Sequence, residues 1–92
     1  MNENQKKIII LYILRILYNY TSYDYPVTQT DIVKYLNDID ISCSRKTVGR
    51  NLKCLMDGGL PVKRKRKTRG GYYYDQSQDA FFVRKDMKKG EK

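Results

Sequence analysis

The sequence predicts one small, mainly helical domain in which three helices are followed by a short β-hairpin. Three observations predict it. The 92 residues suffice for a single hydrophobic core. Capping signals at Thr28 and Ser44 begin two short helices, and a basic run beyond them lies between β-forming residues and glycines. We place the domain at residues 1–75 and expect residues 76–92 to be a short tail, partly ordered at Ala80 to Val83.

The first helix is expected over residues 4–20. Residues 1–25 contain no glycine or proline, and every position from 8 to 18 except Arg15 is apolar or tyrosine. The apolar run is shorter than the roughly 17 to 25 residues that span a bilayer, and no signal-peptide cleavage site follows it. We therefore expect a cytoplasmic protein with no membrane contact.

A helix that is apolar nearly all round must be covered on most sides. We expect the rest of the domain to cover about half of it. The remainder would then meet a second copy, a C-terminal effector domain absent from this chain, or the tail at Phe81 and Phe82, although burial wholly within the domain is the competing expectation. The expected interface of a homodimer is the stripe Ile9, Ile13, Ile16 and Tyr20.

The second helix begins after Thr28, which is expected to be its N-cap, with Asp31 completing a capping box and Val27 acting as a hydrophobic staple. The helix should end near residue 37 or 38. Its core stripe is expected to be Ile32, Val33 and Leu36, with Tyr35 at the edge.

The third helix is expected over residues 44–56, capped by Ser44 and ended by the glycines at 58 and 59. At 100° per residue, one face gathers Val48, Leu52, Leu55 and Met56. The opposite face gathers Lys46, Gly49, Arg50, Lys53 and Asp57, and its glycine would let a large neighbour come close. Two helices joined by a short turn, the later one basic on its free side, form a helix-turn-helix pattern.

Residues 61–74 are expected to form a hairpin around a basic loop that contains glycine. Six of the seven residues from 63 to 69 are basic, which is also typical of a disordered tail or a localisation signal. The β-forming residues on both sides favour the hairpin.

The basic charge is confined to one part of the chain. Residues 43–70 carry ten basic side chains and one acidic one, whereas residues 1–42 carry four and five, and residues 71–92 carry five and four. The net charge of +9 therefore lies within a contiguous block, as an electrostatic footprint on a phosphate backbone requires.

The chain lacks the residue types that most catalytic sites need. It has no histidine, and only two cysteines, Cys43 and Cys54. They do not suffice for a zinc site or a nucleophile–histidine pair, so we expect no enzyme activity, no metal and no cofactor. If both cysteines lie on one helix, they are about 16 Å apart and stay free thiols.

Residues 44–52 (SRKTVGRNL) with Leu55, then 59–62 (GLPV) and 70–73 (GGYY), resemble the N-terminal winged-helix domain of bacterial WYL-domain transcriptional regulators and their DeoR-type relatives. The resemblance covers residues 5 to 75 and implies a recognition helix that enters the DNA major groove. The sequence departs from the family pattern at Lys46, where arginine is usual, and at Asn51, where an acid is usual.

Two functions are compatible with these features. The first is sequence-specific binding of double-stranded DNA by a transcriptional regulator, with the helix at 44–56 in the major groove and the hairpin at 61–74, the wing, on the backbone or minor groove. The second is a winged-helix module for protein interaction that uses the apolar first helix and has only nonspecific affinity for nucleic acid. RNA recognition is disfavoured because the tyrosines do not interleave with the basic block.

For the first function we expect Lys46, Arg50 and Asn51 to reach base edges, although the position of Asn51 favours a structural role. Thr47 could contact the backbone or pack in the helix turn. The expected DNA-binding residues are Ser42, Ser44, Arg45, Lys46, Thr47, Arg50, Asn51, Lys53, Lys63, Lys65, Lys67, Thr68 and Arg69.

Overall fold

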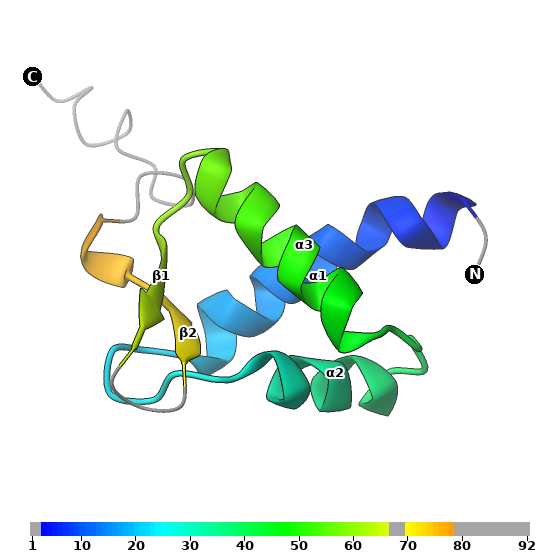
Figure 1. Cartoon of the computed structure of the whole chain (residues 1–92), viewed down its shortest axis with the longest axis horizontal. Coiled ribbons are helices and arrows are strands. Elements are labelled where there is room, and N and C mark those ends of the chain that lie inside the picture. Colours follow the sequence, from blue (N-terminus) through cyan, green and yellow to red (C-terminus); the bar gives the residue numbers. More distant parts are fainter. Residues whose placement is uncertain (1–2, 67–69, 79–92) are drawn as a thin grey trace, which may run out of the picture.

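The computed structural model describes residues 3–66 and 70–78. It contains three helices, α1 (Glu3–Tyr20), α2 (Gln29–Asp38) and α3 (Arg45–Asp57), and an antiparallel hairpin of β1 (Val62–Lys65) and β2 (Gly71–Tyr74), followed by a single 3-10 turn, η1 (Gln76–Gln78). Helix α3 crosses over α1, α2 lies along one side of this pair, and the hairpin closes the end opposite the N-terminus (Figure 1). The predicted arrangement of three helices and a hairpin is confirmed.

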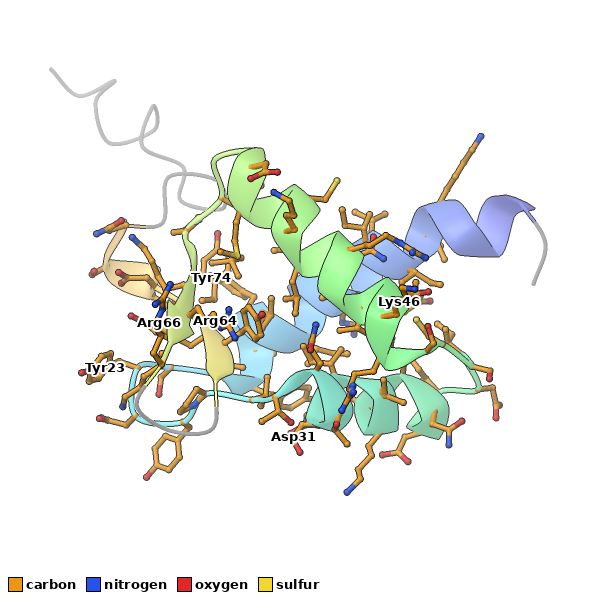
Figure 2. All side chains as sticks on the ribbon, viewed as in Figure 1. Tyr23, Asp31, Lys46, Arg64, Arg66 and Tyr74 are labelled. Carbon is orange, nitrogen blue, oxygen red and sulfur yellow. The ribbon has the colours of Figure 1, made fainter. Side chains whose placement is uncertain are left out.

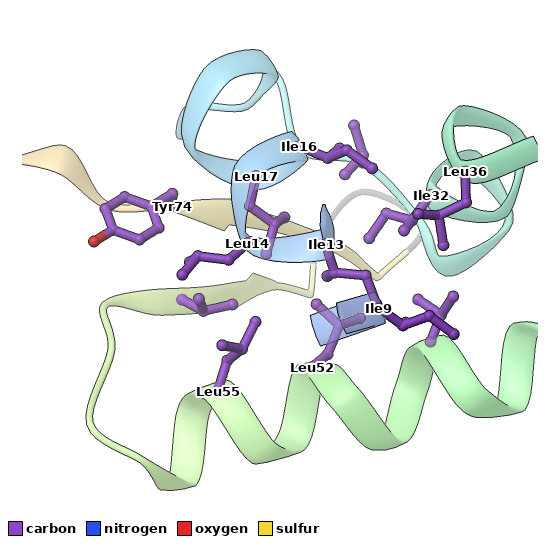
Figure 3. Close-up of a cluster of buried hydrophobic side chains, with 13 residues drawn as sticks. Ile9, Ile13, Leu14, Ile16, Leu17, Ile32, Leu36, Leu52, Leu55 and Tyr74 are labelled. Carbon is purple, nitrogen blue, oxygen red and sulfur yellow. The ribbon is translucent and has the colours of Figure 1, made fainter. Parts of the chain in front are cut away.

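The core is built around α1, which packs against α3, α2 and β2 (Figure 3). Ile13 and Leu17 are completely buried, and Ile32 and Leu36 of α2 meet them from one side. The core consists of Ile9, Ile13, Leu14, Ile16, Leu17, Val27, Ile32, Leu36, Val48, Leu52, Leu55, Val62 and Tyr74.

The expected dimer interface on α1 is wrong at Ile9, Ile13 and Ile16. Ile9, Ile13 and Ile16 are at most 6% exposed because they face this chain's own core. Tyr20, the fourth residue of that stripe, is exposed and stacks on Tyr35 of α2, with ring centroids 5.3 Å apart. The two helices and the hairpin thus cover more of α1 than expected, and its outer strip is limited to residues such as Ile8, Leu11 and Arg15.

Thr21 joins the end of α1 to the hairpin. Its buried hydroxyl donates to the Leu17 carbonyl at 2.6 Å and accepts the backbone N–H of Tyr74 at 2.9 Å. We expect Thr21→Val, which keeps the shape of the side chain but removes the hydroxyl, to lower the free energy of unfolding by about 1–3 kcal/mol, because the Tyr74 N–H loses its partner. Urea unfolding measures the loss. Thr30→Val, at an exposed site on α2, is the control and should change stability by less than about 0.5 kcal/mol.

The predicted start of α2 is confirmed. Asp31 N–H donates to Thr28 Oγ1 at 3.1 Å, and Thr28 N–H donates to Asp31 Oδ2 at 3.0 Å, which completes the capping box. Val27 is buried in the same hydrophobic cluster as Ile32, which is compatible with a staple. Val27 also forms a β-bridge with Tyr72, through N–H···O distances of 2.9 and 2.7 Å, so the chain entering α2 is fixed to β2.

A short turn holds α2 and α3 in a fixed relation. Asp40 adopts φ 62° there, in the left-handed region that aspartate tolerates better than most residues, and Ile41 N–H returns to the Leu36 carbonyl at 2.9 Å. Ser44 caps α3 through a 3.1 Å bond from Thr47 N–H. At the other end Gly59 supplies the left-handed residue, with φ 92°.

The expected inner face of α3 is correct at Val48, Leu52 and Leu55 and wrong at Met56, which is 38% exposed. Met56 lies at the border of the apolar stripe in the last turn. The helix also continues one residue further than expected, to Asp57.

No helix in the described part of the chain is long and apolar enough to cross a membrane. The expected ordered patch at Ala80 to Val83 lies outside the described residues.

Candidate nucleic-acid interface

The exposed face of α3 carries the basic side chains that the helical periodicity predicted. Burial of Val48, Leu52 and Leu55 fixes the rotation of the helix about its axis, so Lys46, Arg50 and Lys53 are exposed. Figure 2 shows Lys46 extending from the first half of α3, near the α2–α3 turn. Lys53 forms an ion pair with Asp57 at 3.2 Å, and because both side chains are largely exposed this pair holds Lys53 only weakly.

A short chain of hydrogen bonds runs along the start of α3. Ser44 Oγ–H donates to Thr47 Oγ1 at 3.0 Å, and Arg50 Nη2 donates to the same oxygen at 3.5 Å. Because Thr47 is half-buried, its side chain packs in the helix turn. Because its hydroxyl accepts from Arg50, it also orients the Arg50 guanidinium. Arg50 therefore lies along the helix surface toward the N-terminal end of α3.

Asn51 has the structural role that its position favoured. Its Nδ2 donates to the Thr47 carbonyl at 2.9 Å, and the side chain is half-buried on the inner side of α3. This position does not favour contact with a base, because the side chain is half-buried and one of its two N–H donors is used within the helix.

Beside this face lies a groove of about 440 Å³ bounded by α2, α3 and the hairpin. Each of these three elements contributes one basic side chain to it, namely Lys34, Arg45 and Arg64. Arg45 is the first residue of α3 and so joins the groove to the exposed face of that helix. The residues that line the groove are Thr28, Gln29, Thr30, Asp31, Lys34, Arg45, Arg64, Gly70 and Tyr72.

The hairpin directs its basic residues to two different sides. Val62 is buried, and because side chains alternate along a strand, Arg64 lies on the same side of β1 as Val62 and faces the groove. Its guanidinium lies over the ring of Tyr72, 5.7 Å from the centroid. Figure 2 shows Arg64 between the hairpin and the helices, and Tyr23 on the far side of the hairpin from α3.

Lys63 and Lys65 occupy the other side of β1. Lys65 Nζ lies 3.9 Å from the Tyr23 ring centroid and donates to the Tyr23 carbonyl at 2.8 Å, while half-buried Lys63 pairs with Tyr73 of β2. Strand alternation therefore turns both lysines away from the groove, while their expected contact with DNA stays a prediction. The expected contacts Lys67, Thr68 and Arg69 lie outside the described residues.

Of the nine residues that line the groove, only Arg45 was among the expected DNA-binding residues. The missed residues include two cations, Lys34 and Arg64, and the amide Gln29. The signal for Arg64 was available, because a buried Val62 places residue 64 on the same side of the strand. Gln29 and Lys34 carried no comparable signal, since their position depends on how α2 packs against α3.

The α2–α3 turn contributes exposed Ser42 and Ser44 beside the N-terminal end of α3.

The expectation that the two cysteines lie on one helix is wrong, because Cys43 precedes α3. Cys43 and Cys54 are both free thiols. Burial raises the pKa of the Cys43 thiol, which therefore stays protonated at neutral pH. The described residues contain no group of three side chains that could hold a metal ion.

Comparison of this chain with protein-family models, curated proteins and solved structures gave no match.

Proposed function

We propose that this chain binds double-stranded DNA as a winged helix-turn-helix domain of a bacterial transcriptional regulator. The observation that carries the proposal is the convergence of Lys34, Arg45 and Arg64 on one groove beside the exposed basic face of α3. Basic side chains that come from separate elements and share one surface form the footprint expected for a phosphate backbone.

In this proposal α3 lies in the major groove, which is wide enough for one helix. Lys46 and Arg50 would reach base edges, with the guanidinium of Arg50 suited to guanine. Arg45, Arg64 and Lys34 would contact phosphates of the strand that passes through the groove between α2 and the hairpin. The order of helices and hairpin is compatible with the winged-helix domains of WYL regulators that residues 44–73 resemble.

The first test is the salt dependence of binding to a random duplex. If about six to eight basic residues each displace a counterion, the slope of log K against log salt should be near −5 to −7. Fluorescence anisotropy at several concentrations of potassium chloride measures this slope. A slope shallower than about −2 would show that the basic surface is not a DNA footprint.

A contact with another protein chain through α1 is the second candidate. The outer strip of this helix leaves Ile8 40% and Leu11 61% exposed, and exposed apolar side chains next to each other favour a partner. A homodimer through this strip would leave the basic face of α3 available for DNA. Light scattering at high micromolar concentration tests the homodimer, since the mass of a single chain would exclude self-association through α1.

A further inference from the structure

Gly49 forms a notch on α3 that the side chain of Gln29 fills. The Gln29 amide nitrogen lies so close to the Gly49 backbone that a Cβ at this position would overlap it. The glycine expected to admit a large external neighbour is therefore already covered by α2. The obstructing atom is the far end of a flexible side chain, so a methyl group at Gly49 would displace the amide rather than the helix.

The Gln29 amide keeps its hydrogen-bonding capacity. Within residues 3–66 and 70–78 its side chain makes no hydrogen bond, and no buried side-chain oxygen or nitrogen there lacks a partner. The polar atoms of the half-buried Gln29 side chain are therefore reachable from solvent, and Gln29 lines the groove. An amide that lies against the helix while its donors and acceptor stay available is suited to recognition.

The notch is surrounded by the basic residues of the proposed interface. Arg45 and Lys53 lie one turn before and one turn after Gly49 on the same side of α3, and Lys46 lies three residues away toward the exposed face. Gln29 thus adds an amide to a surface whose charged groups are three cations and the carboxylate of Asp31, which accepts the Thr28 N–H of the capping box. Cations bind any phosphate, whereas an amide distinguishes donor and acceptor patterns.

We propose that Gln29 is a specificity-determining residue, carried by α2 and positioned by Gly49, that reads one base at the edge of the major groove. The inference rests on the proposed DNA-binding function. A carboxamide can pair in two-point fashion with N6 and N7 of adenine, and we expect adenine at this position. The recognition surface then consists of α3 together with the first residue of α2.

The test begins with selection of binding sites by the wild-type chain from a randomised duplex pool. The selected duplex and its single-base-pair variants are then titrated against wild type, Gln29→Ala, Gly49→Ala and the double variant. Thr30→Ala, which changes an exposed residue lining the same groove, is the matched control.

We expect both single variants to reduce the same adenine preference, from roughly tenfold to less than twofold, while affinity for random duplex stays within about twofold. The double variant should lose nothing further, because both changes remove one amide from one place. Gly49→Ala should also raise the melting temperature by roughly 4 °C, since alanine is the better helix former. Thr30→Ala should keep the preference.

Two results would overturn the inference. One is a base preference that neither single variant changes, and the other is an equal loss on every duplex, which would make Gln29 a phosphate contact. If Gly49→Ala failed to fold, Gln29→Ala alone would still decide between these outcomes. A wild-type chain that binds no duplex at low salt would instead refute the proposed function itself.

Discussion

Ile13→Glu is expected to destabilise this domain severely. Ile13 is fully buried at the centre of α1, where the helix meets α2 and α3, and a carboxylate there must either be desolvated or take up a proton. We expect a loss of about 4 kcal/mol or more, against a total stability of about 5–15 kcal/mol for a typical domain. Circular dichroism during thermal and urea unfolding measures the effect.

The matched control is Leu11→Glu, two residues earlier on the same helix. Leu11 is 61% exposed, so the same carboxylate stays in water and should change stability by less than about 0.5 kcal/mol. Equal unfolding curves for Ile13→Glu and wild type would contradict the burial of this face of α1. A large loss with Leu11→Glu would show that the outer strip is covered by a second copy or by another part of the chain.

The double variant Lys46→Glu/Arg50→Glu is expected to weaken duplex binding by at least about 100-fold at 0.15 M salt. It removes two cations from the exposed face of α3 and puts two anions against the phosphates, and loss of a single base-contacting arginine is already expected to cost about 1–3 kcal/mol. Both side chains are exposed, so the fold should be unchanged, which circular dichroism checks.

Lys7→Glu/Arg15→Glu makes the same change in net charge on the outer strip of α1. Both of its positions are exposed. With a Debye length of about 8 Å at this salt concentration, distant charges are screened, so we expect affinity within about threefold of wild type. Equal losses in the two double variants would mean that net charge, and not the α3 face, controls binding. Affinity unchanged in Lys46→Glu/Arg50→Glu would rule out α3 as the DNA-binding helix.

The elements and their boundaries were largely predictable because their signals are local. Thr28 with Asp31, and Ser44 with Thr47, satisfy backbone N–H groups within three residues of themselves, so a helix start can be located without the rest of the fold. Gly59 marks the end of α3 in the same way. The contrast between apolar and charged positions likewise determined which face of α3 is exposed, and with it Lys46 and Arg50.

The site was predictable only where such a contrast exists. Between residues 8 and 18 of α1 every side chain except Arg15 is apolar or tyrosine, so periodicity gave no reason to prefer one face. The packing of α2, α3 and β2 decided that Ile13 is core while Leu11 is exposed. In the basic run the lysines and arginines all attract phosphate, so charge alone does not distinguish them. The strand alternation set by the burial of Val62 decided that Arg64 enters the groove and Lys65 binds Tyr23 instead.

Sequence alone therefore determined three helices and a hairpin, the caps that begin α2 and α3, and a basic face on α3, because these depend on interactions within a few residues. Tertiary structure alone decided which face of α1 is buried and that Gln29 fills the notch at Gly49. Those features depend on which elements come into contact across the core, and residues separated by twenty positions or more carry no local record of that contact.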